Sequence, residues 1–169
     1  MTIKSLTLAL HTPKSHTPLR HASHPPLAKG TTMTPAGLHH ISLVTADLER
    51  SLAFYRNLLG FVQVERPPFK LAGAWLRFGA SELHLILNPK GTFRATRSID
   101  TDDTHFAIRV GDFEAAIAAL IAKGFRDSGA AEDPMRVYVN RNSIAGYPQA
   151  YLCDPDGNIV EINAAAAKA

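Results

Sequence analysis

The stretches HHISLVTADLERSLAFYRNLLGF (39–61) and THFAIRVGDFEAAIAALIAKGF (104–125) decide the fold, because the chain uses one pattern twice. In each stretch a His, His40 or His105, opens a run in which apolar residues alternate, and an Asp follows seven residues after it. A Gly-Phe pair closes both stretches. A pattern that returns at an offset of about 65 residues indicates two copies of one structural unit.

Each copy predicts a strand followed by a helix. In the first copy, alternation along the strand places His40 on the face opposite Ile41. Asp47 is expected to begin the helix, because its carboxylate can accept from a free amide of the first turn. Gly60 is expected to end it, since glycine takes the left-handed cap conformation without steric cost. The second copy repeats this arrangement, so each copy presents a His on the strand face turned away from its helix.

The residues between and after the two copies predict further strands. They are FVQVERP (61–67), AGAWLRFG (72–79), SELHLILN (81–88), VYVN (137–140), QAYLCD (149–154) and NIVEIN (158–163). Gly79-Ala80 predicts a hairpin and DPDG (154–157) a tight turn. Each half is therefore expected to hold a strand, a helix and three more strands. The two halves are expected to form one α+β domain with two related sheets.

The predicted domain spans residues 35–164, with modules at about 37–90 and about 103–164. Residues 165–169 are expected to be a frayed tail. The chain has 169 residues and is 46% hydrophobic and 20% charged, which is typical of a globular protein. Its single cysteine, Cys153, excludes an internal disulfide and favours a reducing compartment, so the expected location is cytoplasmic. No apolar run reaches the roughly 18 residues of a membrane span.

The first 33 residues differ from the rest. They carry four basic and no acidic residues, whereas residues 34–169 carry 14 basic and 15 acidic ones. The basic charge thus lies outside the domain, which does not favour a nucleic-acid partner. Residues 1–34 are interpreted as a disordered leader or as a gene-model extension with Met33 as the true start. Organelle targeting by residues 1–33 is the alternative.

Four polar residues interrupt apolar strands. His40 and His105 open the first strand of each half, His84 lies between Leu83 and Leu85, and Glu161 lies between Val160 and Ile162. His84 and Glu161 occupy matching places in the last strands of the two halves. If the halves pack about a pseudo-twofold axis, three imidazoles and one carboxylate converge, which is a donor set for a divalent metal.

Taken singly, a His in a strand is more often a satisfied core residue than a ligand. The matched positions favour the metal interpretation, because an unpaired Glu161 would be costly to bury unless a cation bound it. His39 is expected to point the other way and to be structural. Cys153 is interpreted as a packing residue rather than a nucleophile, since no basic neighbour is evident.

The chain resembles the vicinal oxygen chelate superfamily. The matching pieces are LHHISLVTADLERSLAFYRNLLGF (38–61), GAWLRFGASELHLILN (73–88), THFAIRVGDFEAAIAAL (104–120) and YLCDPDGNIVEIN (151–163). The superfamily includes glyoxalase I, fosfomycin-resistance enzymes, extradiol dioxygenases and bleomycin-resistance proteins. The resemblance implies paired βαβββ modules that form a concave, mostly antiparallel sheet cup around one metal ion. It implies a metal site of His40, His84, His105 and Glu161, holding Zn, Ni, Co, Mn or Fe.

The resemblance also implies a function. The first expectation is a lyase or isomerase resembling glyoxalase I, or lactoylglutathione lyase, acting on a hemithioacetal or another α-hydroxycarbonyl compound through a metal-stabilised enediolate. Glu161 would be the catalytic base. Glyoxalase I usually has a second acidic or Gln ligand where this chain has His84. The alternatives are an Fe(II)-dependent dioxygenase using His40, His105 and Glu161, and a bleomycin-resistance-type binding protein, which would lack the ligand residues.

The expected partners are a small-molecule substrate and a second copy of the chain in a homodimer, with no nucleic acid and no membrane. Trp75, Arg77 and Arg109 are expected to line the cup, where the two arginines would bind an anionic substrate; solvated surface arginines are the alternative. The irregular segment 128–149 is interpreted as a substrate-binding lid carrying Arg141 and Tyr147, or as an ordinary loop.

Overall fold

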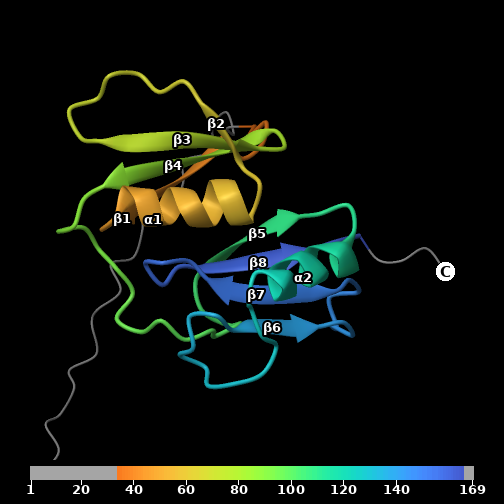
Figure 1. Cartoon of the computed structure of the whole chain (residues 1–169). Helices are drawn as coiled ribbons and strands as arrows, with labels where there is room; N and C mark the ends of the chain where they lie inside the picture. The colour runs from red at the N-terminus through yellow and green to blue at the C-terminus, as the bar shows by residue number, and fades with distance from the viewer. Residues whose placement is uncertain (1–33, 166–169) are drawn as a thin grey trace, which may run out of the picture. The chain divides into compact units, whose positions relative to one another are not determined.

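The structure is a computed structural model, and it describes residues 34–165. The first module contains β1 (His40–Thr45), α1 (Leu48–Leu52), the π-helical segment η1 (Ala53–Leu58), β2 (Val62–Val64), β3 (Gly73–Phe78) and β4 (Ser81–Leu87). The second contains β5 (His105–Arg109), α2 (Phe113–Ala122), β6 (Val137–Asn140), β7 (Gln149–Cys153) and β8 (Ile159–Asn163). Figure 1 shows the two modules, which confirm the predicted α+β fold of paired βαβββ units.

The two sheets have the same topology. The strand order is β1-β4-β3-β2 in one and β5-β8-β7-β6 in the other. In each, the first strand pairs in parallel with the last, and the two remaining pairings are antiparallel. The helix provides the crossover that a parallel pairing needs. As a result, each opening His lies on the strand beside the one that carries His84 or Glu161.

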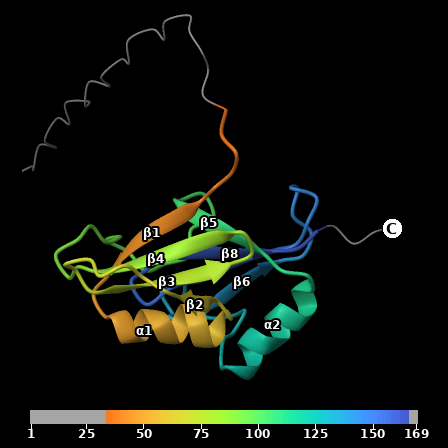
Figure 2. The same ribbon diagram turned by 90° about the horizontal axis from the view of Figure 1, so that it is seen from above.

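Both helices begin and end as expected. Asp47 accepts a hydrogen bond from the amide of Arg50 at 3.1 Å, and Asp112 accepts one from Ala115 at 3.0 Å. Gly60 and Gly124, which follow the helices, have φ of +76° and +92°. The first helix differs from the prediction in one respect, because it widens into the π-helical segment after Leu52. In Figure 2 both helices lie on one side of the strands.

Two local predictions need correction. The strand expected over 61–67, ahead of the Pro67-Pro68 pair, is only three residues long, β2. His39 does not point away from His40, since their Nδ1 atoms lie 2.9 Å apart. The alternation rule fails at His39 because β1 begins only at His40.

Hydrogen bonds join the modules through the DPDG turn. The Tyr55 hydroxyl donates to Asp154 at 2.7 Å, and Ser51 donates to Asp156 at 3.3 Å. Burial raises the pKa of Asp154 and, with the neighbouring carboxylates, holds that of Tyr55 well above its usual value. One apolar core also contains side chains from both modules, including Leu76 and Leu152.

The chain divides into two units, residues 1–36 and 37–169, and the second holds both modules. The interpretations of residues 1–33 fall outside the described residues. Within residues 34–165, no helix is long and apolar enough to cross a membrane.

Candidate metal centre

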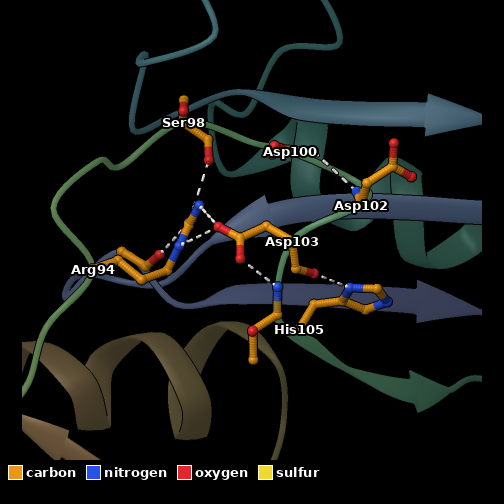
Figure 3. Close-up of polar contacts among 8 residues, drawn as sticks. Arg94, Ser98, Asp100, Asp102, Asp103 and His105 are labelled. Atoms are coloured by element: carbon orange, nitrogen blue, oxygen red, sulfur yellow. Dashed lines mark hydrogen bonds and ion pairs between the residues drawn. The ribbon is translucent and has the colours of Figure 1, made fainter. Parts of the chain in front are cut away.

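The ring of His105 is oriented by a backbone carbonyl two residues earlier in the chain. Its Nδ1 lies 2.7 Å from the carbonyl oxygen of Asp103, and its Nε2 lies 3.4 Å from Oε2 of Glu161 (Figure 3 shows the contact with Asp103). A carbonyl only accepts, so Nδ1 carries a proton, and Nε2, which faces Glu161, is the nitrogen that could bind a metal ion. A metal-binding histidine is commonly held in this way, with its second nitrogen on a carbonyl or carboxylate.

Asp103 is itself held by the connector between the modules. The Arg94 guanidinium donates to its carboxylate at 2.6 and 3.1 Å and to the carbonyl of Gly157 at 2.8 Å (Figure 3). The Thr104 amide, together with Arg94, lowers the pKa of Asp103. Arg94 therefore connects the segment that orients His105 to the turn that leads into β8.

Glu161 is 4% exposed and has partners in the protein. Its Oε1 accepts a hydrogen bond from Asn163 at 2.8 Å, and Asn163 accepts one from Arg109 at 3.0 Å. Burial alone would raise the pKa of Glu161, but hydrogen bonds from Asn163 and Gln149 outweigh this and lower it. Tyr151 and the charge of His105 act in the same direction. The carboxylate is thus ionised at neutral pH, and burial together with Glu161 raises the pKa of Tyr151 to about 12.

The first module holds a different arrangement. His84 is 8% exposed, and its ring stacks between those of His40 and Trp75, each with its centroid 4.2 Å away. The His84 Nε2 lies 2.9 Å from Oε2 of Glu82, and this contact lowers the pKa of Glu82. Sequence reasoning missed Glu82, although its place two residues before His84 in a strand puts it on the same face.

The four predicted ligands occupy matching positions in the two sheets. In the strand registers, His84 pairs with Ser42, and Glu161 pairs with Ala107, in each case two residues after the opening His. The structure brings the ligands together as two pairs, His40 with His84 and His105 with Glu161. Residues 34–165 contain no group of three or more His, Cys, Asp or Glu side chains that could hold a metal ion.

The predicted substrate residues lie in different surroundings. Trp75 lines a cavity with His84, whereas Arg77 is exposed. Arg109 lies over the ring of Tyr147 at 5.3 Å, so it connects that ring to Asn163.

Arg141 forms a two-pronged ion pair with Glu114 at 2.8 and 2.9 Å, in a hollow lined also by Tyr147. The region 128–149 in which it lies contains the strand β6.

Comparison with known proteins identifies the family. The Glyoxalase/Bleomycin resistance protein/Dioxygenase superfamily matches residues 37–162, and the chain belongs to this superfamily. It is 27% identical over 135 residues to Glyoxylase I 4 of Arabidopsis thaliana, covering 79% of this chain and 73% of that one.

Solved structures show the same fold. A glyoxalase family protein of Bacillus anthracis has a TM-score of 0.63 at 20% identity, with 80% of this chain and 99% of the other covered. A lactoylglutathione lyase of Agrobacterium tumefaciens has a TM-score of 0.55 at 22% identity, with 78% and 96% covered. The resemblance expected from the repeated stretches is thereby confirmed.

Proposed function

We propose that this protein is a metal-dependent lyase or isomerase resembling glyoxalase I, which acts on a hemithioacetal or another α-hydroxycarbonyl compound. The observation that carries the proposal is the His105–Glu161 pair. It places an imidazole nitrogen beside a buried carboxylate, and both groups are held by further hydrogen bonds. These donors fit Zn, Ni, Co, Mn or Fe as divalent ions. His40 and His84 would supply the remaining ligands.

A bound divalent ion would stabilise the negative charge that develops on adjacent substrate oxygens when a proton is removed next to a carbonyl. In this proposal Glu161 accepts that proton at a carboxylate oxygen. The hydrogen bonds that lower its pKa keep it ionised at neutral pH, and Asn163 holds its Oε1. Arg109 and Arg77 would contact an anionic part of the substrate.

For His84 to bind the metal through Nε2, its contact with Glu82 must break. Glu82 would then be a carboxylate next to the metal, in the region where glyoxalase I usually has a second acidic ligand. We propose further that the protein is a homodimer in which the two ligand pairs, from one chain or from two, complete the site. A cytoplasmic location remains a prediction.

Metal content tests the proposal. The purified full-length protein should bind about one divalent ion per chain, measured by elemental analysis after exposure to each of the five metals. Glu161→Gln and His84→Ala should each lose metal, whereas Glu65→Gln, on an exposed residue, should not. The metal-loaded protein is then assayed with the glutathione–methylglyoxal adduct. A wild-type protein that binds none of these metals would contradict the proposal.

Mixing two inactive variants tests how the pairs combine. His84→Ala and Glu161→Gln chains, carrying different tags, are co-expressed and the mixed dimer is purified. If each site takes its two pairs from different copies, one of the two sites in the mixed dimer is intact and binds metal. If both pairs come from one chain, the mixed dimer has no intact site.

A second candidate function is an Fe(II)-dependent dioxygenase. The observation that favours it is the Glu82–His84 contact, which leaves His40, His105 and Glu161 as two imidazoles and one carboxylate. This donor set is typical of non-haem Fe(II) oxygenases. Anaerobic loading with Fe(II), followed by measurement of oxygen uptake with catechols, separates the two functions. Uptake that appears only with iron would favour the dioxygenase. The intact ligand residues count against a bleomycin-resistance-type binding protein.

A further inference from the structure

A cavity of about 390 Å³ lies beside His84 in the first module. Two aromatic rings form part of its wall, those of Trp75 and Phe69, with centroids 5.9 Å apart. Leu71 and Ile86 also line it. The wall is therefore largely apolar and contains flat surfaces, which suit a planar ring.

The rim of the cavity leaves apolar surface exposed. Phe69 is 55% and Leu71 is 54% exposed, although both are large apolar residues. They belong to the loop between β2 and β3, which Arg66 holds in place. The Arg66 guanidinium donates to the Leu71 carbonyl at 2.8 Å and lies 4.9 Å from the Phe69 ring. A ligand ring in the cavity would cover this apolar surface.

The charged side chains that line the cavity are basic. Arg66 and Lys70 line it, and no carboxylate residue does. By contrast, the hollow that holds Arg141 is lined also by Asp112 and Glu114. Basic side chains in a lining that contains no carboxylate favour an anion, and an arginine can in addition bind a carboxylate through two donors.

We propose that this cavity binds an aromatic arm of the substrate that carries a carboxylate, with the ring against Trp75 and Phe69 and the carboxylate near Arg66 and Lys70. Because His84 lies in the same wall, the arm would extend from the reacting centre. Only the identification of the ligand as the substrate rests on the proposed function. The preferred substrate would then be an aryl-substituted α-hydroxycarbonyl acid rather than a small aliphatic one.

Trp75 provides a direct readout, because it is the only tryptophan in the chain. Its fluorescence is titrated in the full-length protein after treatment with a chelator, so that no metal takes part. The probes are phenylacetate, phenethyl alcohol, phenethylamine and acetate. Phenylacetate should bind about tenfold more tightly than phenethylamine, with the alcohol between them. Acetate, which lacks the ring, should not change the fluorescence where phenylacetate saturates.

Four variants complete the test. Phe69→Ala should weaken binding of all three aromatic probes, and Lys70→Glu should weaken phenylacetate while strengthening phenethylamine. Ile144→Ala and Lys123→Glu, on exposed residues outside the cavity, are the controls and should change nothing. Equal binding of the three aromatic probes, or an unchanged order in Lys70→Glu, would overturn the proposal. Metal content is measured separately, so if the cavity binds the probes as expected but the wild-type protein takes up no divalent metal, only the proposed function is refuted.

Discussion

Nε2 of His105 lies 3.4 Å from Oε2 of Glu161, and the opposite nitrogen of the same ring is hydrogen-bonded to a backbone carbonyl. The pair belongs to the parallel strands β5 and β8, and each member has a second partner that fixes its orientation. A cation placed between such groups would meet donors that need little rearrangement.

Glu161→Gln should abolish most activity of the metal-loaded protein. The amide keeps the size of the side chain but cannot accept the substrate proton and is a poorer ligand. Loss of a general base typically costs about 10²- to 10⁴-fold in rate. The rate is measured with the adduct of glutathione and methylglyoxal, alongside metal content. Activity within twofold of wild type at full metal loading would remove Glu161 from the chemistry.

Asn163→Ala should raise the pKa of Glu161, because it removes the amide that donates to the carboxylate. A carboxylate with a higher pKa is protonated at a higher pH. The pH below which metal binding weakens should therefore rise. Affinity at neutral pH should fall by about 10- to 100-fold. Titration of metal binding from acid to neutral pH checks this. Asn140→Ala, in strand β6, which β7 separates from β8, should leave the pH dependence of metal binding unchanged.

Tyr55→Phe should destabilise the fold by about 1–3 kcal/mol, because it leaves buried Asp154 without one donor. Chemical unfolding followed by circular dichroism measures the free energy of unfolding. Tyr138→Phe, at a tyrosine that is 38% exposed, should change this free energy by less than about 0.5 kcal/mol. Equal effects of the two variants would show that the Tyr55–Asp154 bond adds little to stability.

The raised pKa of Asp154 predicts a pH dependence of stability. The folded state binds the proton more tightly than the unfolded state, so the wild type should become more stable relative to Asp154→Asn as the pH falls from about 7 toward about 4. The gain is lost again as the pH rises through the folded-state pKa. Unfolding free energies of both proteins at several pH values test the sign. A difference that does not vary with pH would contradict it.

Cys153 should react slowly with thiol reagents. It is 8% exposed, and burial raises the pKa of its thiol, so little thiolate is available. Alkylation by iodoacetamide at neutral pH should be at least about tenfold slower in the folded protein than in denaturant. Rapid labelling of the folded protein would argue against the packing role.

The sequence placed the four predicted ligands at matching strand positions but missed some of the residues that contact them. His105 and Glu161 were found because repeated stretches place them at matching strand positions. Glu82 was overlooked, although alternation alone sets it beside His84. Asp103 contributes to the orientation of His105 through a backbone carbonyl, which any residue type could supply. The amino-acid type at position 103 therefore could not have indicated that contact.

The two βαβββ modules, their helix caps and the strand faces that carry His40, His105, His84 and Glu161 could all be predicted from the sequence. These features depend on local periodicity and on hydrogen bonds between residues near in the chain. Three features required the folded chain: the meeting of the predicted ligands as two pairs, the hydrogen bonds of Arg94 to both Asp103 and Gly157, and the apolar cavity with a basic rim beside His84. Such contacts join residues far apart in sequence, and their geometry follows from packing rather than from any local pattern.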